Sequence, residues 1–380
     1  MTKRLRIGYV PLTDAALLHV AKAQNFAAAR GIEMELVADV SWANIRDKLV
    51  AGYFDAAHML APAAIAVSLG IGHIKAPLLA PVALGLNGNA ITVSNTLFEA
   101  LLQEAQGDMA NPRVTAKALA KVVAKRRQSG EPQLTLGHVF PFSSHHYQLR
   151  LWLRAGCIDP DEDVRLTVVP PPFMVETLRK GQVDGFCVGA PWNSLAVAAG
   201  TGAILHQGTD IVRDCPEKML AVRAAWALSH EREISALAEA VADASRWAAV
   251  PGNRSALVTL LANTAEHAVS TATIDSILDT PGSPSGTALA ATGLRLDEEA
   301  IKADPAQALW LFAQMVAAGQ TDYSDALAEA AAAVYAPALG PPIPHTTATP
   351  AVFDGPAFSP NDIPSYLAAL EDRRNPKSST

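Results

Sequence analysis

Four residues of types that bind small anions stand where predicted strands end or predicted helices begin: Trp42, His145, Gly189 and Lys218. Lysine supplies a positive charge, an imidazole N–H donates a hydrogen bond, and glycine leaves its backbone amide accessible. An indole ring adds a flat apolar face. The set suits a small planar anion. Each residue also has a simpler interpretation, with Trp42 as a packing aromatic, His145 as a helix-capping residue and Lys218 as a surface lysine.

The common catalytic and metal-binding signatures are absent from the sequence. It contains no G-x-x-x-x-G-K-[ST] loop, no H-E-x-x-H, no C-x-x-C and no G-x-S-x-G elbow. His145 and His146 are adjacent, so their side chains point apart on a helix, and no third ligand stands at a suitable spacing. We therefore expect a protein that is not an enzyme and that has neither a metal site nor a cofactor.

The elements that must position these residues are short strands alternating with longer helices. The predicted strands are residues 4–10, 33–40, 54–60, 89–94, 133–140, 164–169 and 184–188. The predicted helices are residues 14–29, 41–51, 143–155 and 174–180. Repeated strand–helix–strand units require mainly parallel sheets with helices on both faces. Ligands of such sheets lie at the carboxyl ends of the strands, which is where the candidate residues fall.

A chain of 380 residues fits two α/β lobes with a ligand cleft between them. We place residues 1–94 and 190–336 in lobe I, whose last part, beyond Leu220, is helical and rich in alanine. Residues 95–189 form lobe II. Residues 337–380 are rich in proline, threonine and glycine, and we expect an extended tail that packs on the body.

Composition and charge exclude several classes of protein. No window has 18 unbroken apolar residues, so we expect no membrane-spanning helix. A net charge of −7 argues against direct binding of nucleic acid. The three cysteines, Cys157, Cys187 and Cys215, have no metal-like spacing and fit a reducing compartment. The first residues enter an alternating pattern instead of a secretory apolar run, so we expect a cytoplasmic protein.

Several segments resemble the nitrate-binding branch of the periplasmic binding protein superfamily, whose other branches bind bicarbonate, sulfonates and taurine. The most specific of them is Phe186-Cys187-Val188-Gly189-Ala190-Pro191-Trp192-Asn193. The others are Val40–Ala43, Ala57–Pro62, Gly88–Val93, His145, Trp152–Pro160, Val168–Pro172, Pro216–Lys218 and the tail segments Phe353–Gly355 and Tyr366-Leu367. The resemblance covers nearly the whole chain and implies a two-lobed, type II binding-protein fold.

By that resemblance, the positions that surround the anion are held by Trp42, Asn89, His145, Gly189 and Lys218. Asn89 stands where nitrate transporters have Gln, and Ala190 where they commonly have Glu. Bicarbonate binders of this pattern have an acidic residue in place of Lys218, with a metal ion nearby. The lysine therefore favours nitrate or nitrite as the ligand.

The family offers three roles. A cytoplasmic relative, the NasS-type nitrate and nitrite sensor, holds an RNA-binding antiterminator of the NasT type (with an ANTAR domain) inactive until the anion binds. The absence of an export signal at the start of this sequence favours that sensor over the solute-binding component of a nitrate ABC transporter. Thiamine-pyrimidine synthases share the two-lobed fold but have a cysteine-rich segment, whereas Cys187 stands alone here.

Overall fold

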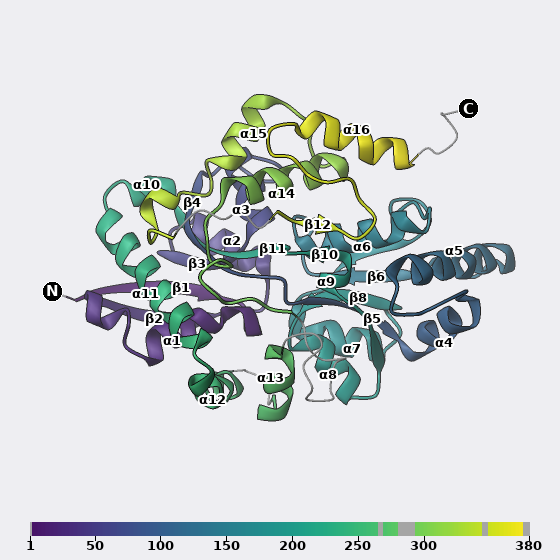
Figure 1. Ribbon diagram of the computed structural model, residues 1–380, viewed down its shortest axis with the longest axis horizontal. Helices are drawn as coiled ribbons and strands as arrows, with labels where there is room; N and C mark the ends of the chain where they lie inside the picture. Colours follow the sequence, from purple (N-terminus) through teal and green to yellow (C-terminus); the bar gives the residue numbers. More distant parts are fainter. Residues whose placement is uncertain (1, 265–268, 280–292, 344–348, 375–380) are drawn as a thin grey trace.

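The first of two five-stranded sheets is built mostly from the amino-terminal part of the chain. The computed structural model describes residues 2–264, 269–279, 293–343 and 349–374. The strands of this sheet are β1 (Lys3–Tyr9), β2 (Ile32–Ala38), β3 (Ala56–Leu60), β4 (Leu78–Leu86) and β11 (Pro216–Arg223). Their order is β2-β1-β3-β11-β4 (Figure 1). With its helices, this sheet forms the first lobe.

The second sheet forms the core of the second lobe. Its strands are β5 (Asn89–Ser94), β6 (Thr135–His138), β7 (Arg165–Val168), β8 (Gly185–Gly189) and β9 (Gly202–Gln207), in the order β7-β6-β8-β5-β9. In each sheet four strands run in one direction, and a single strand, β11 or β5, runs the other way. The mainly parallel α/β architecture predicted from the sequence is confirmed.

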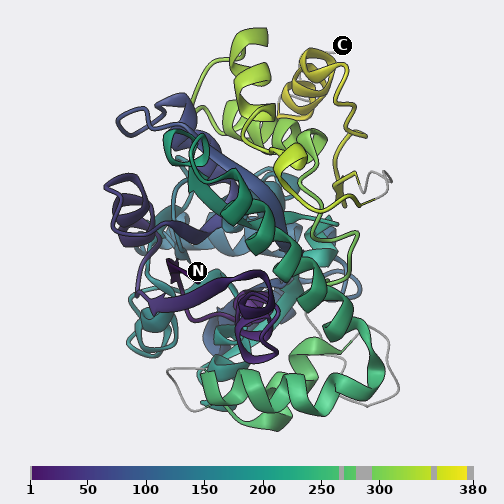
Figure 2. The ribbon, with the colours of Figure 1, turned by 90° about the vertical axis from the view of Figure 1, so that its left-hand side faces the viewer.

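Helices cover both faces of each sheet. The first lobe has α1 (Ala16–Ala23), α2 (Trp42–Val50), α3 (Ala61–Leu69), α10 (Ala224–Ala227), α11 (Glu231–Ala249), α12 (Arg254–Thr264), α13 (Thr271–Leu278), α14 (Pro305–Ala317) and α15 (Asp325–Ala332). The second lobe has α4 (Asn95–Glu104), α5 (Pro112–Ser129), α6 (Ser144–Ala155), α7 (Met174–Arg179), α8 (Trp192–Ala198) and α9 (Gly208–Ile211). Figure 2 shows α14 and α15 at one end of the molecule and α12 and α13 at the other.

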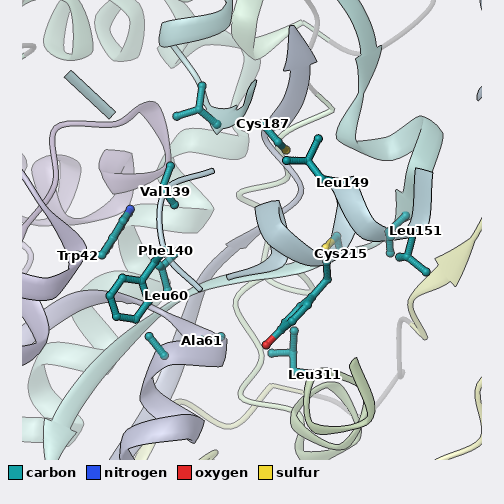
Figure 3. Close-up of a cluster of buried hydrophobic side chains, with 14 of the residues drawn as sticks. Trp42, Leu60, Ala61, Val139, Phe140, Leu149, Leu151, Cys187, Cys215 and Leu311 are labelled. Carbon is teal, nitrogen blue, oxygen red and sulfur yellow. The ribbon is translucent and has the colours of Figure 1, made fainter. Parts of the chain in front are cut away.

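Two hydrophobic cores follow from this arrangement. One lies between β1, α1 and α11 and contains residues such as Ile7, Leu17 and Val241. The other lies on the α2, α3 and α14 side of the first sheet and continues into the second lobe. Figure 3 shows part of this second core, in which Trp42 and Leu60 of the first lobe belong to the same cluster as Val139 and Phe140 of the second. The lobes are therefore packed against each other.

The lobe boundaries predicted from the sequence need correction. We placed residues 89–94 and 202–207 in lobe I, but these are β5 and β9 of the second sheet. The chain leaves the first sheet after β4 and returns to it at β11. The two crossing segments are bonded to each other, because Asn87 N–H donates to the Cys215 carbonyl and Cys215 N–H donates to Asn87 Oδ1, each at 2.9 Å.

The tail lies across both lobes. Strand β12 (Ala351–Val352) pairs antiparallel with β10 (Val212–Arg213), and Asp354 forms an ion pair with Arg113 of α5. Farther on, α16 (Ile363–Arg374) packs on α14, where Gln314 donates to the hydroxyl of Tyr366 at 2.9 Å. We expected an extended segment, whereas its last described part is a helix.

No helix among the described residues is long and apolar enough to cross a bilayer.

The amino terminus of α6 depends on one buried side chain. Ser143 Oγ accepts from the backbone N–H of His146 at 3.1 Å and donates to the Phe140 carbonyl at 2.6 Å. We expect Ser143→Ala to lower the free energy of unfolding by about 1–2 kcal/mol, since it removes a cap and leaves the buried Phe140 carbonyl with only its contact to His138 Nδ1. Urea denaturation measures this. Ser270→Ala, at the exposed cap of α13, is the control and should cost less; equal costs would contradict a special role for the Ser143 cap.

Candidate functional site

Lys218 is buried between the two lobes with its charge intact. It lies on β11, opposite Leu60 of β3 and Gly85 of β4, and only 1% of it is exposed. Its ammonium group is 2.9 Å from Asp14 Oδ2 and 2.9 Å from Glu217 Oε2. A buried ammonium group is unstable unless it is paired. Burial alone would lower the pKa of Lys218, but the two carboxylates more than offset that effect and raise it.

Asp14 is the first carboxylate of this cluster. It lies in a 3₁₀ turn, η1 (Thr13–Ala15), just beyond the carboxyl end of β1. Its Oδ1 is 3.0 Å from Nε2 of the buried His58. Burial alone would raise the pKa of Asp14, but Lys218 and His58 outweigh burial and hold that pKa well below its usual range. Asp14 is therefore ionised.

Glu217 is the second carboxylate, and its surroundings differ. Its Oε1 accepts hydrogen bonds from Asn89 Nδ2 on β5 and from Ser144 Oγ on α6. Burial raises the pKa of Glu217, and Lys218 and Ser144 offset this rise only in part. Two neighbouring carboxylates thus respond in opposite ways, because the ammonium and an imidazole both stabilise the charge on Asp14.

Two aromatic rings complete the site. Trp42 is the first residue of α2, after the N-cap Ser41, and the Lys218 ammonium is 5.4 Å from the centre of its ring. His145 lies in the first turn of α6 and is fully buried. Burial first and Lys218 second lower its pKa well below 6.5, so the imidazole is neutral at pH 7. Trp42 Nε1 and both ring nitrogens of His145 have no hydrogen-bond partner in the part of the chain that the structure describes.

Gly189 ends β8, where it pairs with Asn89 of β5. A Cβ atom at this position would lie 3.5 Å from Asn89 Oδ1 and 3.6 Å from Asp14 Oδ2, both ordinary contact distances. The surrounding side chains would therefore leave room for a Cβ atom at position 189, and they do not require glycine there. It does bring the backbone of the second lobe beside the Asp14 carboxylate of the first.

All five residues predicted from the sequence lie around this ion cluster. Trp42 and Lys218 come from the first lobe, and Asn89, His145 and Gly189 from the second. Sequence reasoning did not assign site roles to four further residues: Asp14, His58, Ser144 and Glu217. One available signal was the position of Asp14 at the start of the predicted helix 14–29, because the starts of predicted helices also pointed to Trp42 and His145.

Neither a metal-ligand cluster nor a reactive Cys187 is found in the described part of the chain. No group of three or more His, Cys, Asp or Glu residues suited to a metal ion occurs within the described ranges. Cys187 is fully buried on β8 with Sγ 3.5 Å from Gln148 Oε1. Burial and the charge of Glu217 raise the pKa of the Cys187 thiol well above its usual value, so it is protonated and unreactive.

Comparison with known proteins identifies the family. The model of the NMT1-like family matches residues 1–262. The chain belongs to the NMT1-like family. The crystal structure of the periplasmic nitrate-binding protein NrtA from Synechocystis superposes with a TM-score of 0.81 at 25% identity, covering 97% of this chain and 98% of that one. This match confirms the two-lobed binding-protein fold.

Two curated relatives extend the comparison. The nitrate import ATP-binding protein NrtC of Synechocystis is 32% identical over 98% of this NMT1-like chain and 56% of its own length. The bicarbonate transport ATP-binding protein CmpC of Synechococcus elongatus is 36% identical over 68% of this chain and 37% of its own. The chain thus spans roughly half or less of the length of these two relatives. Their names refer to transport of small anions.

The ion cluster predicts opposite pH dependences for two variants. The pKa of Asp14 is lowered on folding, so its ionisation stabilises the fold above its ordinary pKa of about 3.9, and that contribution is lost as pH falls through the lowered value. The pKa of Glu217 is raised, so its contribution is complete below its ordinary pKa of about 4.3 and is lost as pH rises through the raised value.

We therefore expect Asp14→Asn to cost on the order of 3 kcal/mol at pH 7 and less as the pH approaches 3. Glu217→Gln should become more stable relative to the unsubstituted protein as the pH rises from 4 to 8. Urea denaturation of the ligand-free protein across this range measures both effects. Parallel pH profiles for the two variants would contradict the assignment of charges.

Proposed function

We propose that this interlobe site binds nitrate or nitrite. The observation that carries the proposal is Lys218, a buried ammonium beside donors from both lobes, with Trp42 Nε1 and His145 lacking partners among the described residues. Two of the ammonium hydrogens point to carboxylates, and the third is left for an anion. The matches to NrtA and NrtC support nitrate as the ligand.

The donors offset the cost of removing an anion from water. A small oxyanion loses strong hydration on burial unless charge and hydrogen bonds replace it. Lys218 supplies the charge. The Trp42 indole, one His145 nitrogen and the Gly189 amide supply neutral donors. Asn89 acts differently from the direct role that the resemblance implies, because its Nδ2 is bonded to Glu217 and so positions that carboxylate.

Binding of the anion would favour the form in which the two lobes are close together. Lys218, Asp14 and Trp42 belong to the first lobe, whereas His145 and Gly189 belong to the second. An anion that needs donors from both lobes binds the closed form more tightly than the open form and shifts the population towards it. Arg46 of α2, whose guanidinium lies 5.4 Å from the ring centre of Phe140 in the second lobe, makes one of the contacts between the lobes in this structure.

The role that we propose for this closure is sensing in the cytoplasm. The protein would hold an RNA-binding antiterminator of the NasT type, with an ANTAR domain, until nitrate or nitrite closes the lobes and changes the surface that the partner contacts. The chain itself would not bind RNA, in keeping with its net charge of −7. The chain matches 56% of NrtC, a nitrate import ATP-binding protein; the ATP binding in that name fits a cytoplasmic protein, whereas the nitrate import fits the alternative role.

The alternative is the solute-binding component of a nitrate ABC transporter. The similarity to the periplasmic nitrate-binding protein NrtA, at a TM-score of 0.81 over nearly the full length of both chains, favours it. The same site would serve either role, because both need lobes that close on the anion. The two roles differ in partner and in compartment. A thiamine-pyrimidine-synthase-like enzyme finds no support in the buried, protonated Cys187.

Trp42→Phe tests the binding site with little change in packing. It keeps an aromatic ring over the Lys218 ammonium but removes the Nε1 donor, so nitrate affinity should fall about tenfold, the equivalent of one hydrogen bond of about 1.4 kcal/mol. Titration calorimetry with sodium nitrate measures this. Trp152→Phe is the matched control, because that indole already donates to Thr115 Oγ1 at 3.0 Å; its nitrate affinity should be unchanged. An unchanged affinity in Trp42→Phe would remove the indole from the site.

Co-purification from native cells tests the partner. The full chain should recover an ANTAR-type regulator in the absence of nitrate and lose it when nitrate is added, because the closed form no longer fits the partner. With Trp42→Phe, release should need about ten times more nitrate. Recovery of the protein from the periplasmic fraction, together with membrane components of a transporter, would contradict sensing and favour the alternative.

A further inference from the structure

Glu217 contacts Lys218, the charged donor that a bound oxyanion would also contact. One oxygen of its carboxylate contacts the Lys218 ammonium at 2.9 Å, and the other accepts from Asn89 Nδ2 and Ser144 Oγ. These donors come from β11 in the first lobe and from β5 and α6 in the second. A carboxylate and a nitrate are both stabilised by a nearby ammonium group, so Glu217 and the anion would share the single positive charge of Lys218.

The charge balance of the site is unfavourable to an added anion. Lys218 contributes one positive charge, and the ionised forms of Asp14 and Glu217 contribute two negative charges. His58 and His145 are neutral at pH 7, because burial lowers the pKa of each. With both carboxylates ionised, the cluster carries −1 before an anion enters and −2 afterwards. Like charges at such short range in a buried site raise the free energy strongly.

No further cation in the described part of the chain compensates Glu217. The ionisable groups that act on it are Lys218, Asp14, Cys187, Cys215 and Tyr335. Burial raises the pKa of both thiols and of the Tyr335 hydroxyl, so all three are neutral. Lys218 is therefore the single positive group in contact with the carboxylate, and it is shared with Asp14.

We propose that Glu217 takes up one proton from solvent when the anion binds, so that anion and proton enter the site together. This inference rests on the proposed function and concerns its regulation by pH. The proton bonds to a carboxylate oxygen of Glu217 and gives a neutral carboxyl group. The Lys218 ammonium then pairs with Asp14 and the anion. The new O–H group of Glu217 can donate a hydrogen bond to the anion.

Two features select Glu217 over Asp14 as the proton acceptor. Asp14 is held ionised by Lys218 and His58, whereas burial already raises the pKa of Glu217 in the ligand-free site. An arriving anion raises that pKa further, since a second negative charge disfavours ionisation. Asn89 and Ser144 remain in place, because a neutral carboxyl group still accepts hydrogen bonds from both.

Titration calorimetry of the full chain with sodium nitrate tests this inference. At pH 7 the binding enthalpy should vary linearly with the ionisation enthalpy of the buffer, phosphate against Tris, with a slope equal to one proton taken up. The dissociation constant should rise about tenfold per pH unit above neutrality, as linkage requires for one proton. This measurement on the unsubstituted protein needs no variant to fold.

Glu217→Gln should abolish both the buffer dependence and the pH dependence. The control is Glu176→Gln, a half-exposed residue paired with Arg179 and Lys180, which should behave as the unsubstituted protein does. Tight nitrate binding with no proton uptake would overturn this inference and leave the proposed function standing. Proton uptake that persists in Glu217→Gln would overturn it in favour of another group. Absence of nitrate binding by the folded protein at every pH would overturn the proposed function itself.

Discussion

The ion cluster of Lys218, Asp14 and Glu217 is the interaction on which the interlobe site depends. An ammonium and two carboxylates are removed from water together, and each is tolerable only because the others are present. Asp14 holds the charge of Lys218 in place, and the hydrogen bonds from Asn89 and Ser144 fix the carboxylate of Glu217. Loss of Lys218 would leave two buried carboxylates without a cation, so the cluster constrains all the elements that meet there.

Those elements are arranged by the topology of the two sheets. The carboxyl ends of the parallel strands in both lobes face the same interlobe region, so the loop after β1 and the first turns of α2 and α6 meet there. The antiparallel strand β11 places Lys218 between β3 and β4. The bonded pair of crossing segments at Asn87 and Cys215 keeps the lobes joined close to the cluster. The topology of the two sheets thus determines which residues meet at the interlobe site.

The sequence was informative wherever local pattern and topology agreed. The first strands, the helices predicted over residues 41–51 and 143–155, and the two lobes followed from periodicity. Strand β4 was not predicted. It contains Pro81, which is tolerated because β4 is at the edge of its sheet. Strand β11 was not predicted because a lysine and a glutamate within it are buried, which no single-residue preference anticipates.

Site residues were predicted by their positions after strands, but the charges between them were not. In the sequence analysis Lys218 was an isolated positive charge. In the structure it pairs with its neighbour in the chain, Glu217, and with the distant Asp14. Asp14 lies about 200 residues away, and its pairing depends on how β1 and β11 are placed in one sheet. Pairings of this kind depend on tertiary structure and cannot be read from spacing alone.

The course of the tail has a mechanical consequence. It is anchored to the first lobe through α16 and α14, and to the second through the short β10–β12 pairing and the Arg113–Asp354 ion pair. Any hinge opening must therefore stretch this tether or break its weak end. Breaking the two-residue β10–β12 pairing and one surface ion pair requires little free energy. Of the two attachments of the tail, the one on the second lobe is therefore the weaker, and it is the one that a separation of the lobes would break first.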